Sequence, residues 1–357
     1  MASLTSDEKD SQRPDKAPPY PPSWIDRVTN WIEHRSWPSW SFYLAIGAGL
    51  LIIQALVVWI EGALPFPNID LAQAYLAGVT AFMLALINYL DKRAGLALAT
   101  MRQVLKASGR EYNHLAYKLT TLPVRPTLLA SVLALIFVFL TEAISKPYQL
   151  DALKPFPLSA NSLRFVYLIC WWIFGAFLYH TIHQLRAINL IYSRYTQVDL
   201  LRVKPLYAFS KIAALTAGSL AMIVYGWWLA NPWIDRRDPL VLIPMIVLIL
   251  AAIATFVWPQ HGIHSLQVAE KERLLDEANQ RLESMISELH QQVDERKLAS
   301  MTDLNMAMSC LEIELNTLRK TPTWPWEPEV IQVLITALAL PLGLWLLQLM
   351  LERIISP

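Results

Sequence analysis

Apolar residues dominate seven long stretches of the chain, and polar segments separate them. The stretches cover approximately 41–60, 71–90, 127–145, 165–185, 207–230, 239–258 and 329–352. Each is close to the roughly 20 residues that a helix needs to cross about 30 Å of hydrocarbon. Lipid offers the backbone no hydrogen-bonding partner, so each stretch is expected to be helical. The pattern predicts an all-α, polytopic membrane protein with seven transmembrane helices.

Basic residues are concentrated in the segments on one side of this arrangement. The segments 1–40, 91–126, 186–211 and 259–328 carry five, seven, five and seven Lys or Arg residues, which leaves six of the 30 for the rest of the chain. Cytosolic segments are the ones enriched in Lys and Arg. The sequence therefore predicts a cytosolic N-terminus, an external C-terminus and an integral protein of the plasma (inner) membrane. The first apolar stretch begins only at about residue 41, so no cleavable signal peptide is expected.

The segments outside the membrane are expected to be mostly helical. Residues 1–22 are polar and Pro-rich, which is typical of a disordered tail. Residues 23–38 begin with a capping-box pattern and predict an amphipathic helix on the inner leaflet; packing against the protein's own cytosolic helices is the alternative. Helical extensions are expected at 91–122 and 186–206 of the six-helix bundle, 41–258.

A cytosolic helical hairpin is expected at 259–322, ahead of the seventh crossing at 328–353. Its second half places apolar residues three and four apart, at Met301, Leu304, Met308, Leu311, Leu315 and Leu318. Such spacing forms a seam along one face of a helix. The seam can close within the chain or against other subunits, and both are expected. A homo-oligomer follows from this interpretation.

Composition narrows the function further. Hydrophobic residues make up 55% and charged residues 17%, against about 45–50% and 25% in soluble domains. A net charge of +1 gives no reason to expect nucleic acid as a partner. The chain contains no nucleotide-binding glycine loop, HExxH, nucleophile elbow or CxxC motif. An enzyme and a cofactor are therefore not expected.

Four histidines leave one metal-based alternative open. His180 and His183 lie three residues apart at the end of the fourth crossing, and His261 and His264 repeat that spacing after the sixth. Imidazoles at one depth can bind a transition metal. Neither pair has an Asp, Glu or Cys beside it in the sequence as a further ligand. The favoured interpretation is therefore histidines that face headgroups or donate to carbonyls.

Aromatic residues gather towards the outer half of the predicted bundle, at Phe137, Phe139, Tyr167, Trp171, Trp172 and Tyr225. They are candidates for a pocket that takes a small apolar ligand from the outer side. Ordinary packing between membrane helices is the alternative. Asn88 and Glu142 are polar groups within crossings, and a structural role is favoured for both.

The last crossing differs from the others because it contains Pro341 and several polar residues. Its candidate pore-lining residues are Thr336, Leu340, Leu344 and Gln348. A mostly apolar, bent helix of this kind can line a pore that is gated by a hydrophobic constriction. A peripheral helix is equally compatible with the pattern.

The order of these parts resembles the seven-transmembrane ion channel superfamily of the insect odorant and gustatory receptors. The resemblance covers the prolonged fourth crossing, the long cytosolic helix after the sixth, and the second cytosolic helix that leads into the seventh. Of the gustatory-receptor pattern Thr-Tyr, five apolar residues, Gln-Phe, the aligned stretch from Pro341 to Leu349 keeps only Gln348. The resemblance implies a tetramer, a cation pore lined by the seventh crossings and ligands in the outer half of each subunit.

The sequence therefore favours an oligomeric channel-like membrane protein, ligand-gated and cation-permeable if the resemblance holds. A non-conducting sensor or scaffold, whose cytosolic coiled coil binds a partner, is the second interpretation. A metal-binding membrane protein that uses the paired histidines is the third.

Overall fold

The computed structural model describes residues 18–144, 153–197, 200, 204–231, 239–294, 301–324 and 326, followed by 329, 331, 332, 335, 336, 339, 343 and 350. Within that part every regular element is helical, so the all-α prediction is confirmed. Six of these helices are long and apolar enough to cross a membrane, which indicates a membrane protein. The seventh predicted crossing lies mostly outside the described residues.

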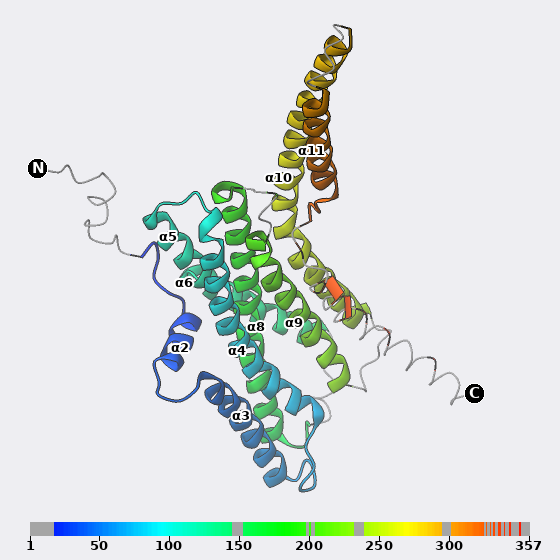
Figure 1. Cartoon of the computed structure of the whole chain (residues 1–357). Coiled ribbons are helices and arrows are strands. Elements are labelled where there is room, and N and C mark those ends of the chain that lie inside the picture. The colour runs from blue at the N-terminus through cyan, green and yellow to red at the C-terminus, as the bar shows by residue number, and fades with distance from the viewer. Residues whose placement is uncertain are drawn as a thin grey trace, which may run out of the picture.

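Figure 1 shows the bundle of candidate membrane-spanning helices and the shorter elements that connect or extend them. The six candidate spans are α3 (Ser39–Glu61), α4 (Leu71–Met101), α6 (Val124–Ile144), α8 (Pro157–Leu190), α9 (Ala208–Ala230) and α10 (Pro239–Asp294). The other elements are α2 (Trp24–Glu33), α5 (Gly109–Thr120), α11 (Met301–Lys320) and the short turns η1 (Arg102–Val104), η2 (Ile191–Tyr195) and η3 (Lys204–Tyr207). Figure 1 shows the end of α10 and all of α11 projecting from the bundle as an arm.

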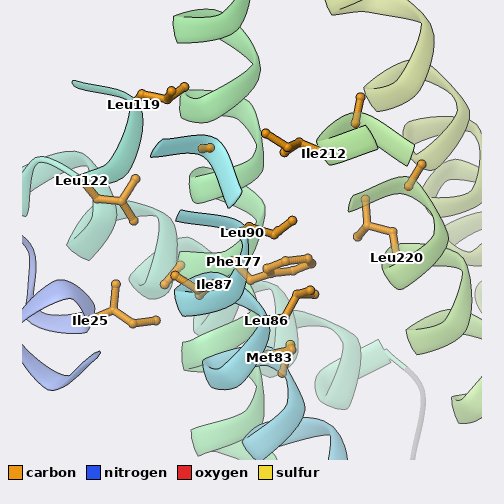
Figure 2. Close-up of a cluster of buried hydrophobic side chains, with 14 of the residues drawn as sticks. Ile25, Met83, Leu86, Ile87, Leu90, Leu119, Leu122, Phe177, Ile212 and Leu220 are labelled. Atoms are coloured by element: carbon orange, nitrogen blue, oxygen red, sulfur yellow. The ribbon is translucent and has the colours of Figure 1, made fainter. Parts of the chain in front are cut away.

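Helix α4 is the central helix of the bundle. Two thirds of its most apolar window is buried inside the protein, against about a fifth for α3 and α6. Figure 2 shows Met83, Leu86 and Leu90 of α4 beside Phe177 of α8, with Ile212 of α9 across from them. A central position also explains why α4 carries several polar side chains, which are buried within the protein and kept from lipid. They are Gln73, Thr80 and Asn88.

Helix α8 packs very closely against α6 at one glycine. A Cβ atom at Gly175 would lie 2.5 Å from the Ala130 carbonyl oxygen and 2.8 Å from the Ala134 Cβ. Small residues at such a crossing allow the two backbones to approach and gain van der Waals contact in the absence of a hydrophobic driving force. Gly175 is therefore required for this contact by space, since nothing larger fits.

Helix α10 joins the sixth predicted crossing, 239–258, to the predicted hairpin, 259–322, without interruption. It runs through Pro259 to Asp294. Proline removes one intrahelical hydrogen bond. The residues around it, Phe256, Gln260 and Ile263, are all buried against the bundle. Tertiary packing thus supports the helix at this proline.

Candidate functional site

The chain returns from the hairpin to the bundle through a stack of four aromatic rings. His264 of α10 stacks on Trp324 with ring centres 3.8 Å apart, and Trp324 stacks on Trp326 at 4.4 Å. Trp326 in turn stacks on Phe256 of α10 at 5.6 Å. The His264 Nδ1 atom also donates to the Thr323 carbonyl at 2.9 Å. These contacts fix the start of the last apolar segment beside α10, and we refer to the four rings as the aromatic clamp.

A lysine ties the end of α11 to α10 next to the aromatic clamp. Lys271 Nζ donates to the carbonyl oxygens of Arg319 and Thr321, both at 2.8 Å. The last carbonyls of a helix have no intrahelical partner, and a positive charge there also favours the helix dipole. The lysine therefore caps α11 and closes the hairpin at its base.

The last apolar segment is only partly described. Thr336 is exposed, and its hydroxyl donates to the Gln332 carbonyl at 2.8 Å. Ile335 is 58% exposed and Met350 65% exposed. The other three predicted pore-lining residues, Leu340, Leu344 and Gln348, lie outside the described residues. The described residues of this segment after Gln332 are thus all exposed.

The leucine seam of α11 closes on α10 of the same chain. Leu311 and Leu315 form a buried cluster with Ala278 of α10, to which Leu275, Leu282 and Met285 add partly buried contacts. Leu304 and Leu318 are buried too, and Met308 is half-buried. The side chain of Met301 lies outside the described part. Of the two pairings that the sequence left open, the contact within the chain is present in the structure.

One buried carboxylate joins α2 to the start of α6. Asp26 Oδ2 accepts hydrogen bonds from the Ser23 amide at 2.9 Å, the Ser23 hydroxyl at 2.8 Å and the Leu122 amide at 3.0 Å. The Ser23 amide also donates to the Leu122 carbonyl at 2.9 Å. Burial raises the pKa of Asp26 above its usual range, and the hydrogen bonds from Ser23 and Leu122 oppose that rise. The capping box expected at residue 23 is present.

Histidines of α8 have separate partners. His180, 1% exposed, donates from Nε2 to Asp91 Oδ1 of α4 at 2.8 Å. His183 Nε2 donates to the Lys118 carbonyl at 2.9 Å. His264 belongs to the aromatic clamp and His261 is exposed. Among the described residues no group of three or more His, Cys, Asp or Glu side chains could hold a metal ion. The structure thus does not assemble the four histidines into one site.

Only part of the expected aromatic pocket is brought together. Trp171 contacts Phe137 with ring centres 5.4 Å apart and Tyr167 at 6.1 Å. Trp172 instead packs on Trp24 of α2 at 5.9 Å. Phe139 is 48% exposed, with its ring under the Arg164 guanidinium, and Tyr225 is half-buried. The contact of Phe137 with Trp171 joins α6 to α8, whereas that of Tyr167 with Trp171 lies within α8.

Several polar contacts were not foreseen from the sequence. The sequence places Asp91 only at the start of a cytosolic extension, yet it accepts the hydrogen bond from His180. Glu142 forms an ion pair with Arg164 at 2.8 Å. Asn88 donates to the Tyr43 hydroxyl at 2.8 Å, which fits the structural role favoured for it. Each of these partners lies on another helix. The available signal was the presence of a charged or amide side chain inside an apolar stretch.

Comparison with known proteins gives no relative. No family model, no curated protein and no solved structure matches the chain. The functional argument therefore depends on the arrangement of the residues themselves.

Proposed function

We propose that this protein is an oligomeric, channel-like membrane protein whose pore is lined by the last apolar segment, 328–353. The observation that carries the proposal is the contrast between the anchored residues just before the segment and the exposed residues that the structure describes within it. The aromatic clamp holds Trp324 and Trp326 against α10. Beyond the clamp, Ile335, Thr336 and Met350 are all exposed in the single chain.

The hydrophobic core supports this interpretation because it is built without those exposed positions. Its buried members come from α2, α3, α4, α5, α8, α9 and α10, together with connecting segments. Trp326, at the clamp, also packs against this core. Among the described residues of the segment, none belongs to the buried core, and these positions are available for contacts between subunits.

Cyclic symmetry favours the central axis of the oligomer as the place for these contacts between subunits. Cyclic assembly gives every subunit the same environment, so an element at the inner edge of one subunit meets its own copies. The segment carries polar Thr336 and Gln332 among apolar residues, and polar groups in a membrane favour helix interfaces or water-filled spaces. A cation pathway with an apolar constriction at Leu340 and Leu344 follows from this placement.

Crosslinking between subunits tests the placement. The test uses full-length protein with Cys310, which is exposed, replaced by Ser. Thr336→Cys should give an oxidative crosslink between neighbouring subunits, and a bifunctional thiol reagent should extend it towards four subunits. Leu133→Cys on α6, where the side chain is 55% exposed, is the matched control and should remain monomeric. If Thr336→Cys is accessible to thiol reagents and yet gives only monomers, the segment does not line an axis.

A non-conducting scaffold is the second candidate, and one observation favours it. The hairpin carries an open groove of about 790 Å³ between α10 and α11, lined in part by Glu277, Met285 and Glu314. Met306 and Ile313 are 63% and 66% exposed on α11. A dimer without conductance would favour this candidate.

A further inference from the structure

Helix α2 presents its basic and aromatic face outwards. Its isoleucines, Ile25 and Ile32, are 0% and 1% exposed and belong to the core of the bundle. Arg27 and Trp31 lie on the opposite, exposed side, and Arg35, two residues beyond the end of the helix, is exposed too. This orientation is the reverse of an amphipathic helix that inserts its apolar face into lipid.

Two contacts and a short connection to α3 place α2 beside the ends of the candidate membrane helices. At its start, the Leu122 amide donates to Asp26 just before α6 begins. Near its end, Glu33 forms a 2.8 Å ion pair with Lys92 of α4. Six residues after α2, α3 begins at Ser39. Figure 1 shows α2 on the flank of the bundle, beside the start of α3.

The exposed face of α2 is positive. The two acidic residues of the helix are both engaged, since Asp26 is buried and Glu33 is paired with Lys92. Arg27 lies on the exposed side, and Arg35, which follows the end of the helix, reaches back to it with its guanidinium 4.4 Å from the centre of the Trp31 ring. Stacking of this kind orients the guanidinium and leaves its N–H groups directed at solvent or ligand.

The positive face continues into a surface of the kind that faces lipid. Trp37 and Trp40, between α2 and the first turn of α3, are 72% and 67% exposed. Exposed apolar residues follow along α3, at Leu44, Ile52, Ile53, Leu56 and Ile60. Trp is the residue type that membrane proteins place at headgroup level, next to the hydrocarbon. The occupant of the α2 face therefore lies in the same layer as lipid headgroups.

We infer that α2 is a binding site for anionic phospholipid headgroups, with Arg27 and Arg35 as the phosphate-binding residues and Trp31 as the stacking platform. Arginine binds phosphate through its planar fork of N–H donors. The site requires only that the bundle is embedded in a membrane, and it is independent of the proposed pore.

Lipid binding to the purified full-length protein tests the inference. Native mass spectrometry in detergent would measure the affinity for phosphatidylglycerol and for phosphatidylcholine, with glycerol 3-phosphate as a probe for free phosphate. We expect wild type to prefer phosphatidylglycerol. Arg27→Gln combined with Arg35→Gln should weaken its binding about 30-fold, because each basic residue near an anionic surface contributes about 1 kcal/mol.

Two control proteins separate lipid recognition from general charge loss. Lys106→Gln combined with Arg281→Gln removes two exposed cations elsewhere and should retain the wild-type preference. Arg27→Lys combined with Arg35→Lys keeps the charge but loses the planar fork and the stack on Trp31, so its affinity for phosphatidylglycerol should fall between those of wild type and the double Gln variant. The inference is overturned if the double Gln variant binds phosphatidylglycerol as wild type does, if the control loses as much, or if glycerol 3-phosphate binds with equal affinity.

Discussion

The Glu61 carboxylate at the end of α3 accepts a hydrogen bond from the Ser159 backbone amide of α8 at 2.6 Å. Its second oxygen accepts from the Leu158 amide at 2.9 Å. The first amides of a helix have no intrahelical partner, and Pro157 at the first position has none to donate. Phe156 provides no side-chain cap. The cap of α8 is thus supplied by a residue about a hundred positions earlier in the chain.

Replacing Glu61 with Ala should lower the melting temperature of the protein in detergent. Two amides at the start of α8 would lose their acceptor, and the link between α3 and α8 would be lost. Glu61→Gln keeps one acceptor oxygen and should fall between Ala and wild type. Glu312→Ala, an exposed acid on α11, is the control and should melt near wild type. A Glu61→Ala protein as stable as wild type would show that water caps α8 equally well.

Asp26 should be needed for stability through its oxygen atoms more than through its charge. Asp26→Ala leaves the amide of Leu122 without its acceptor in a buried position, which costs about 1–3 kcal/mol. Asp26→Asn can present its amide oxygen to the same donors and should cost less. Chemical unfolding followed by tryptophan fluorescence would measure both. Equal losses for Ala and Asn would contradict the assigned role of the oxygen.

The same residue gives a pH dependence with a defined sign. Burial raises the pKa of Asp26 above the unfolded value of 3.8. The folded protein therefore favours the protonated form, and this contribution is fully present below that value and is lost as pH rises through the folded pKa. An Asn at position 26 does not ionise, so the Asp26→Asn protein lacks this pH-dependent loss. The free energy of unfolding of Asp26→Asn relative to that of wild type should therefore increase from pH 4 up to the folded pKa of Asp26. A constant difference over that range would contradict the raised pKa.

The hairpin should open when charge is placed in its seam. Leu311→Lys would bury an unpaired charge beside Ala278 and Leu315, at a cost of several kcal/mol. Hydrogen exchange should then accelerate across 301–320, while the bundle stays protected. Ile313→Lys, two residues away and 66% exposed, is the control. Equal exchange in both variants would count against a seam within the chain.

Much of the bundle could be predicted from hydropathy, because each membrane-spanning segment forms its backbone hydrogen bonds within itself and therefore needs no partner from elsewhere in the chain. A stretch such as 71–90 has no alternative to a helix in lipid. The capping box at Ser23 and Asp26 is also local, and it is present. The continuity of α10 through Pro259 could not be predicted in this way, because a helix in contact with the bundle can tolerate a proline that its own sequence would not favour.

The candidate sites could not be predicted in this way, because their residues contact partners that lie far away along the sequence. His180 and His183 share their spacing with His261 and His264, yet the former pair meets Asp91 and Lys118 and the latter does not share one environment. The aromatic clamp joins residues about 60 positions apart. Spacing along one helix defines a face, but only the packing of helices decides what that face contacts.

Membrane orientation can be tested by labelling single cysteines in intact cells. In a Cys310→Ser background, Leu158→Cys, 63% exposed at the start of α8, should react with a membrane-impermeant thiol reagent. Gln103→Cys in η1, also exposed, should react only after permeabilisation. Ser159 is a poor position for this test because it is buried. The opposite labelling pattern would invert the orientation inferred from the Lys and Arg distribution.

Ion flux through purified protein in liposomes is the most direct measurement of the proposed function. Leu344→Ser should make an apolar constriction easier to wet and so raise the resting cation flux above that of wild type. Leu133→Ser, on the exposed face of α6, should leave the flux unchanged. Stoichiometry and folding would be checked on the same samples. If wild type and Leu344→Ser are both silent across voltages while folded and oligomeric, the protein is not a channel.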